Sequence, residues 1–211
     1  MTNMRPLAGL LSKIVLGTAL AASLSGCVAL AVGGAATAAL SANDRRTLGM
    51  QTEDKAINVK AELKMRELTG ENGHVNVTSY NRKVLLTGEV RDEAMKQAAE
   101  REVRAIANVV SVINELEIAG PSSFTSRSND ALITTKVKAS LVDKKTVSAT
   151  AFKVTTERGV VYLMGLVTQR EGNIAADVAK GVPGVNRVVK IFEYIQDEDP
   201  RASQSAPRQA S

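Results

Sequence analysis

Hydrophobic residues recur along this chain first with a helical period and then with an extended one. Four apolar residues are spaced as on the buried face of a helix: Ile57, Ala61, Met65 and Leu68. Val75 and Val77 follow with polar residues between them, which is the alternation of a half-buried strand. After a polar turn at residues 80–83, the apolar run 84–90 predicts a second strand. The pattern therefore predicts a helix followed by a hairpin.

A second helix and a last strand follow this hairpin. Asp92 is the predicted N-cap of the helix, because its side chain can accept a backbone hydrogen bond there. The inner face of this helix is predicted to consist of Met95, Ala99, Val103 and Ile106. Residues 110–118 alternate as a strand, although polar Asn114 interrupts the apolar side. The first copy thus has the order helix, strand, strand, helix, strand.

The same pattern recurs further along the chain. Residues 84–90 match residues 161–167 at a shift of 77 positions, and Asp54 matches Asp130 at a shift of 76. This period exceeds the roughly 20–50 residues of solenoid units, so each copy is long enough to be a complete small domain.

The second copy predicts the same five elements. Three polar residues are predicted to cap its first helix: Ser128, Asn129 and Asp130. The buried face of that helix would be formed by Ile133, Val137 and Leu141. Arg158-Gly159 is the predicted hairpin turn. Three residues of the second helix are predicted to face the core: Ile174, Val178 and Val182. Pro183-Gly184 should end this helix, because proline cannot continue it and glycine tolerates a left-handed cap. Residues 188–195 then close the sheet.

These patterns predict an α+β fold of two tandem domains. Each domain would be an αββαβ two-layer sandwich, with its helices on one face of the sheet. Residues 51–119 and 129–196 are the predicted domains, joined by the Gly-, Pro- and Ser-containing residues 120–128. Residues 197–211 are polar and aperiodic, which predicts a disordered tail.

The N-terminus has the features of a secretory signal. Arg5 and Lys13 precede an uncharged stretch that ends in small residues, Ser25 and Gly26, directly before the single cysteine, Cys27. Small residues immediately before a cysteine resemble the bacterial lipobox. This resemblance implies cleavage before Cys27, with a diacylglycerol and an N-acyl chain on the new N-terminal residue.

The lipobox divides the N-terminal part of the chain in two. Residues 1–26 would be a lipoprotein signal peptide, and residues 27–50 a lipidated tether rich in small residues. The alternative is an uncleaved transmembrane anchor, because residues 14–43 contain no charge and are long enough to span a bilayer. Either interpretation places the two domains outside the cytoplasm and next to a membrane.

Charge differs between the two copies. Residues 51–119 contain 10 Lys and Arg against 12 Asp and Glu, a net charge of −2. Residues 129–196 contain 10 Lys and Arg against 6 Asp and Glu, a net charge of +4. Only the second copy is therefore suited to an anionic surface.

The composition argues against an enzyme. His74 is the only histidine and Cys27 the only cysteine, so we expect no metal site and place His74 at the surface, with Glu71 as a candidate partner. Glu100 and Glu102 are two residues apart on a helix and point to different sides, so they form no carboxylate pair. We expect no cofactor other than the acyl chains on the cysteine.

Residues 181–184 fit the GxxG loop of nucleic-acid-binding KH domains. A helix stop before a strand explains the same residues without a ligand, and export would keep the chain away from RNA. We therefore expect no nucleic-acid partner.

Several motifs together resemble the BON domain. They are a strand ending in Gly88 or Gly165, an Ala-rich helix, and Val182-Pro183-Gly184-Val185 followed by Val188. Two such copies behind a lipobox resemble the dual-BON outer-membrane lipoproteins over residues 20–196. The resemblance implies a non-catalytic protein on the periplasmic face of the outer membrane that supports envelope integrity. It also implies anionic phospholipid binding by the second domain. Val28, which is not Asp, implies sorting to the outer membrane.

The first helix of the second copy is the candidate phospholipid site. Leu132 stands where the first copy has Ala56, and Lys136 and Lys138 flank it. An apolar tip can enter the acyl boundary while lysine side chains reach phosphates. The pattern and the resemblance together give five candidate contacts: Leu132, Ile133, Lys136, Lys138 and Ser140. The alternative is that Leu132 widens the core contact and the lysines form a solvated face.

A second function class stays open at the sequence level. The strands at residues 110–118 and 188–195 are predicted sheet edges, and exposed edges can pair with a strand of another protein. The chain would then be an adaptor for an outer-membrane assembly protein, a division protein or peptidoglycan. Rising salt should weaken lipid binding more than edge pairing.

Overall fold

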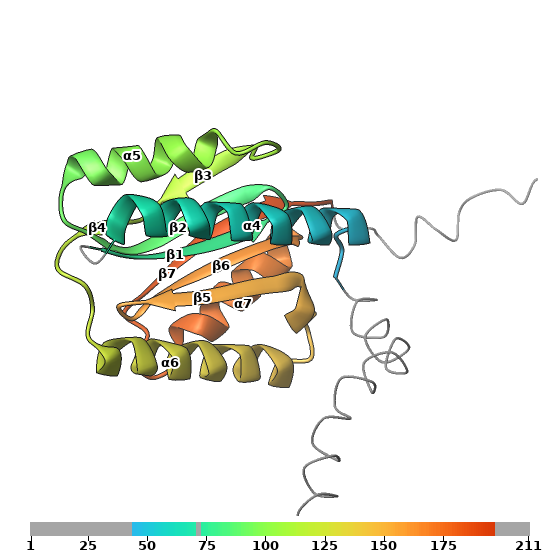
Figure 1. The fold of residues 1–211 in the computed structure, drawn as a ribbon. Coiled ribbons are helices and arrows are strands. Elements are labelled where there is room, and N and C mark those ends of the chain that lie inside the picture. The colour runs from blue at the N-terminus through green and yellow to red at the C-terminus, as the bar shows by residue number, and fades with distance from the viewer. Residues whose placement is uncertain (1–43, 71–72, 197–211) are drawn as a thin grey trace, which may run out of the picture. The chain divides into compact units, whose positions relative to one another are not determined.

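The computed structural model describes residues 44–70 and 73–196, and both predicted copies are present in it (Figure 1). The first copy consists of α4 (Leu48–Thr69), β1 (His74–Tyr80), β2 (Lys83–Val90), α5 (Glu93–Arg104), β3 (Ser111–Asn114) and β4 (Glu117–Ile118). The second consists of α6 (Phe124–Asp143), the short 3-10 helix η3 (Ala149–Ala151), β5 (Phe152–Glu157), β6 (Val160–Val167), α7 (Gln169–Lys180) and β7 (Arg187–Tyr194). The predicted α+β fold with two αββαβ units is confirmed.

Each copy has its own small sheet with the second strand in the centre. β2 is antiparallel to β1 and parallel to β3 and β4, and β6 is antiparallel to β5 and parallel to β7. Between β3 and β4 the ladder is interrupted, and the Asn114 side chain donates to the Lys96 carbonyl oxygen of α5 at 2.9 Å. The polar residue on the apolar side of this strand therefore finds a partner on the helix above it.

The predicted apolar stripes of the first copy are buried. Ile57, Ala61 and Met65 of α4 pack with Met95, Ala99 and Val103 of α5 in one core. The Asp92 carboxylate accepts the Met95 backbone N–H at 2.8 Å, as an N-cap does. The faces of both helices and the start of α5 follow directly from the sequence pattern in this copy.

The first helix of the second copy begins earlier than predicted. α6 starts at Phe124, and its N-cap is Ser123, whose side chain accepts the Ser126 N–H. The predicted capping residues 128–130 therefore lie inside the helix, and part of the predicted linker is helical. The helix starts early because the Ser123 side chain accepts the Ser126 backbone N–H, which would otherwise have no partner in the first turn.

The second helix of this copy also differs from the prediction. α7 ends at Lys180, with Gly181 as its C-cap, so Val182 and Pro183 lie beyond it. Small residues occupy the centre of its buried face: Gly172, Ala175, Ala176 and Ala179. Ile174 and Val178 pack only at the margin of the core. Close packing explains the small residues, because a Cβ on Gly172 would lie 2.9 Å from the Phe192 ring.

Both hairpin turns are held by a buried aspartate from the first helix of their copy. The Asp54 carboxylate accepts the N–H groups of Asn81 and Arg82 at 2.7 and 2.8 Å. Asp130 accepts those of Arg158 and Gly159 at 2.9 and 2.8 Å. All four turn residues have positive φ, as type I′ hairpins require. The Asp54–Asp130 repeat is therefore a structural device that joins helix to hairpin.

The faces of the two sheets that carry no helices pack against each other. Their shared core consists of Tyr80, Leu85, Val160, Tyr162 and Met164. The Tyr80 hydroxyl donates to the Ala151 carbonyl oxygen at 3.4 Å and accepts the Leu166 N–H at 3.3 Å. The fold thus buries both faces of each central strand, one under helices and one under the other domain.

Residues 44–50 belong to the folded part and not to the predicted tether. α4 begins at Leu48, and the Arg46 guanidinium pairs with Asp54 at 2.7 Å and lies 3.9 Å from the centre of the Tyr80 ring. Arg45 donates to both carboxylate oxygens of Glu171 on α7, at 2.7 and 2.8 Å. The segment before α4 therefore contacts both copies.

Candidate functional site

Helix α6 lies on the second domain with one face buried and one face outward. Its inward residues are Asp130, Ile133, Val137 and Leu141. Because successive helical residues are about 100° apart, Leu132 points away from this face. Its side chain is 59% exposed. The structure therefore presents Leu132 to the surroundings rather than to the core.

The outward side of α6 carries further exposed apolar residues, which form a strip with a lysine on either side. Phe124 and Val142 are exposed large apolar residues on this helix. Lys136 and Lys138, both exposed, lie on opposite sides of Leu132, about 40° and 120° around the helix. Neither lysine forms an ion pair with a residue that the structure describes. This arrangement matches that of an interfacial helix, with an apolar strip between cationic side chains.

Lys136 and Ser140 also line a groove between α6 and the end of α7. The groove has a volume of about 460 Å³, and its other side is formed by Val178, Val182 and Pro183. Asp177 contributes a carboxylate to the same groove. Two of the predicted contact residues therefore meet in one hollow beside the helix.

Ile133 is placed differently from the other candidates. Its side chain is 1% exposed and belongs to the core of the second domain. A contact between Ile133 and a lipid would require the core to open, so its inclusion among the contact residues is wrong for this structure. The residue fixes the rotation of α6 and thereby keeps Leu132 outward.

The equivalent helix of the first domain provides an internal comparison. α4 also exposes apolar residues, Val59 and Leu63 among them. It contains four basic and four acidic residues, whereas α6 contains three basic and two acidic ones; one acidic residue of each helix, Asp54 and Asp130, is buried. Lys144 and Lys145 extend the basic character just past the end of α6. The two helices therefore differ in charge more than in apolar exposure.

Part of the positive charge of the second domain is paired with the first domain. Arg158 lies 3.2 Å from Glu117, and Arg187 lies 3.8 Å from Glu115. These pairs use acidic residues of the first copy. Four basic groups that form no ion pair with a described residue lie on α6 or directly after it: Lys136, Lys138, Lys144 and Lys145.

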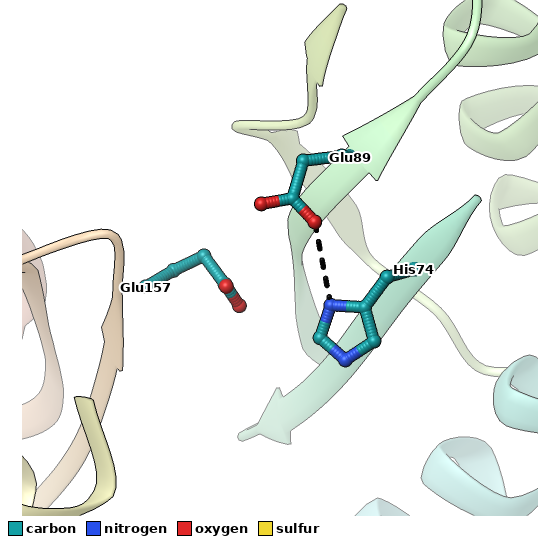
Figure 2. A group of neighbouring side chains, drawn as sticks. All are labelled: His74, Glu89 and Glu157. Atoms are coloured by element: carbon teal, nitrogen blue, oxygen red, sulfur yellow. Dashed lines mark ion pairs between the residues drawn. The ribbon is translucent and has the colours of Figure 1, made fainter. Parts of the chain in front are cut away.

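A second cluster of ionisable side chains lies where the domains meet. Figure 2 shows His74 from β1, Glu89 from β2 and Glu157 from β5 facing one another. One ligand atom of each residue lies within 4.8 Å of the others. The Glu89 side chain is fully buried, and its Oε2 lies 3.5 Å from His74 Nδ1. Burial raises the pKa of Glu157, while an Asn76 side-chain N–H donates to it at 2.7 Å.

The sequence pattern gave no sign of this cluster. His74 was expected at the surface, but it begins β1 and is half-buried against β2. Glu71, its suggested partner, lies outside the described residues. Glu89 pairs with His74 at the open end of the first hairpin, whereas Glu157 ends β5 beside the turn of the second hairpin, and only the packing of the two domains brings Glu157 next to the other two residues. Glu157 ends a strand that also contains Lys153, Thr155 and Thr156, so its position in the sequence gave no signal of a buried cluster.

The lipidation site lies outside the described residues, as do residues 1–43 as a whole. Among the helices that are described, none is long and apolar enough to cross a bilayer. The predicted acylation of Cys27 thus stays a prediction.

Comparison with known proteins agrees with this architecture. The BON domain family matches residues 54–120 and 129–196. The chain is 41% identical over 175 residues to "Outer membrane lipoprotein DolP" of Haemophilus influenzae, covering 82% of this chain and 90% of that protein. It is 33% identical over 155 residues to "21 kDa hemolysin" of Actinobacillus pleuropneumoniae, covering 72% of this chain and 80% of that protein.

The two family matches coincide with the two αββαβ units of the structure. BON-domain lipoproteins are generally non-enzymatic. The chain therefore belongs to the BON domain family, and it is a DolP-like outer-membrane lipoprotein with two BON domains.

Proposed function

We propose that α6 of the second domain docks on anionic phospholipid at the periplasmic face of the outer membrane. The single observation that supports this most is the exposed Leu132 between Lys136 and Lys138. Leu132 would enter the boundary of the acyl chains, and the lysine side chains would reach the phosphates. The proposed role is non-catalytic and serves the integrity of the envelope.

Electrostatics and apolar contact would contribute together. Each lysine close to an anionic membrane contributes about 1 kcal/mol, which falls as salt screens the surface. Lys136, Lys138, Lys144 and Lys145 all lie on or directly after α6. Burial of one leucine side chain adds about 1.5–3 kcal/mol. These contributions give reversible docking. Permanent attachment to the membrane comes from another part of the chain.

Permanent attachment would come from Cys27. We propose that residues 1–26 are removed and that the cysteine carries three acyl chains. One chain gives marginal membrane binding, whereas two signals already anchor a protein stably. Helix α6 would therefore orient the domains on the membrane without being needed to keep them there.

Vesicle flotation tests the docking proposal. A fragment that begins at Asp44 should float with vesicles containing phosphatidylglycerol and not with pure phosphatidylcholine, and high salt should weaken the binding. Leu132→Glu should lower binding by about tenfold or more, because it adds a negative charge where the apolar contact is made. The full-length Leu132→Glu chain should stay in the outer-membrane fraction, because its acyl chains are unchanged.

Leu63→Glu is the matched control. Leu63 is similarly exposed at 54%, but it lies on the charge-balanced helix α4 of the first domain. Its substitution should leave vesicle binding unchanged. If the Leu132→Glu fragment bound vesicles as tightly as the unsubstituted fragment, α6 would not be the docking helix.

An adaptor role is the second candidate, and one observation favours it. β7 is an eight-residue edge strand of its sheet, and such an edge can accept a strand from another protein. Partners of this class would be outer-membrane assembly proteins, division proteins or peptidoglycan-bound proteins. Partner binding that persists in high salt and in Leu132→Glu would support this function instead.

A further inference from the structure

We propose that His74, Glu89 and Glu157 form a binding site for a divalent transition-metal ion that joins the two BON domains. The three side chains come from β1, β2 and β5, so two ligands belong to the first domain and one to the second. Figure 2 shows both carboxylates and the imidazole directed into the same space. This inference does not depend on phospholipid docking, which uses a different surface.

The geometry suits a metal after a small adjustment. The ligand atoms lie within 4.8 Å of one another. In a tetrahedral zinc site, ligand atoms at about 2.0–2.2 Å from the ion lie about 3.4 Å from one another, so side-chain movements of about 1–1.5 Å would close the site.

Burial provides a second and independent reason for a ligand. Glu89 is 0% exposed, and its Oε1 accepts no hydrogen bond from the part of the chain that the structure describes, although it forms an ion pair with Arg158. His74 Nδ1 is likewise a buried atom without a hydrogen-bond partner. A buried carboxylate oxygen left in this state is costly, and such atoms in native proteins often indicate an ion. The nearest cationic group to that oxygen is Arg158 Nη1, at 3.5 Å.

The other oxygens of the two carboxylates are already oriented by the protein. Glu89 Oε2 accepts the Ser122 N–H at 3.1 Å, and Glu157 Oε2 accepts the Asn76 side-chain N–H at 2.7 Å. Outer hydrogen bonds of this kind fix ligand direction in metal sites. Neither of these bonds uses the second oxygen of its carboxylate, so each carboxylate can turn that oxygen toward an ion, which at Glu89 would take the place of the Arg158 guanidinium.

The ligand set selects the class of metal. Imidazole with two carboxylates suits Zn²⁺ and similar transition ions, whereas Mg²⁺ and Ca²⁺ prefer oxygen ligands alone. His74 and Glu157 also line a cavity of about 370 Å³, where water could complete the coordination. Two negative carboxylates at one point of the interface would repel each other, and a divalent cation would turn this repulsion into a contact between the domains.

The test uses the full-length, untagged chain in detergent after removal of metals with a chelator. Its single histidine makes the imidazole signals of His74 unambiguous in NMR spectra. Zn²⁺ and Mg²⁺ are titrated separately, and calorimetry gives the stoichiometry and affinity. Thermal unfolding followed by circular dichroism is measured with and without Zn²⁺.

One Zn²⁺ per chain should bind, with Mg²⁺ at least about 100-fold weaker, and Zn²⁺ should shift the imidazole signals and raise the Tm. His74→Asn and Glu157→Gln should each weaken Zn²⁺ binding by about tenfold or more. Glu193→Gln is the control, because Glu193 also contacts the other domain through Asn81 and Lys83 but lies outside the cluster.

Unaltered circular dichroism of the metal-free variants shows that they remain folded. Absence of saturable Zn²⁺ binding would overturn the proposal. So would Zn²⁺ binding that leaves the His74 signals unmoved, or that is equally tight in His74→Asn and Glu157→Gln.

Discussion

Buried Asp54 and Asp130 show how a single residue can fix the geometry of a hairpin. Each carboxylate accepts two consecutive backbone N–H groups of a turn whose residues have positive φ. Non-glycine residues adopt this conformation at a cost, which the hydrogen bonds to the aspartate offset. The same carboxylates join the first helix of each domain to its first two strands. These residues therefore stabilise local and tertiary structure at once.

Asp54→Ala tests this role at the residue scale. Besides the two turn N–H groups, Asp54 accepts from the Ser79 hydroxyl and pairs with Arg46, each at 2.7 Å. Arg46 keeps Asp44 as a partner at 2.7 Å, but the removal of Asp54 leaves two turn N–H groups and the Ser79 hydroxyl without their acceptor, so the free energy of unfolding should fall by about 3–5 kcal/mol. Urea denaturation measures the loss. Asp92→Ala, which removes the exposed helix cap of α5, should have a clearly smaller effect; equal losses would refute the special role of Asp54.

At the residue scale, the sequence predicted where individual residues lie on their elements better than which side chains contact each other. The repeat marked Asp54 and Asp130 as equivalent, but a shift of 76 residues says nothing about what a side chain contacts. Helical spacing placed Leu132 about 100° from Ile133, at the edge of the buried stripe, and left open whether it widens the core contact; in the structure its side chain is 59% exposed. The hairpin register places Glu89 directly across from His74, but Glu157 lies on the other domain, so this second partner could not be predicted without the tertiary packing.

At the scale of elements, helix faces were predicted more reliably than helix ends. Apolar spacing defines a face over several turns, whereas a start depends on one hydrogen bond, such as the one at Ser123. α7 has the stronger start signal, a capping box in which Thr168 and Glu171 exchange side-chain-to-backbone hydrogen bonds. Glu171 also receives Arg45, which links the segment before α4 to this helix.

Glu171→Gln tests the combined cap and ion pair. The hydrogen bonds from Arg45 hold the pKa of Glu171 below its usual value. A carboxylate with a lowered folded-state pKa stabilises the fold above its unfolded pKa of about 4.5, and this contribution disappears as the pH falls through the lowered value. At pH 7 the variant should lose about 1 kcal/mol.

The difference between this variant and the unsubstituted chain should shrink as the pH falls from about 5 to 3. Glu67→Gln, at an exposed position of α4, is the control and should show little change at any pH. Urea titrations at several pH values measure both variants. A difference that stays constant down to pH 3 would contradict the proposed contribution of the Glu171 charge.

At the scale of the whole described structure, the packing of one sheet on the other was the main unpredicted feature. The signal was present, since residues 84–86 and 160–164 are continuous apolar runs, as in strands buried on both faces. An αββαβ sandwich with helices on one face leaves the other face free, and nothing in the pattern says what covers it. In the structure, Leu85 packs with Tyr162 and Met164 of the other copy, whereas its neighbour Leu86 packs under its own helices.

Because Leu85 and Leu86 pack in different cores, substitutions at these two positions test the coupling between the domains and the stability of the first domain separately. The full-length chain should unfold in a single transition, because the shared core ties the domains together. Leu85→Asp buries a charge between the sheets, so the domains should part and unfold in two transitions while each keeps its own core. Leu86→Asp places the charge in the core of the first domain and should unfold that domain directly. Hydrogen exchange of the β2 and β6 peptides distinguishes these outcomes, and a single shared transition in Leu85→Asp would show that the sheet contact does not couple the domains.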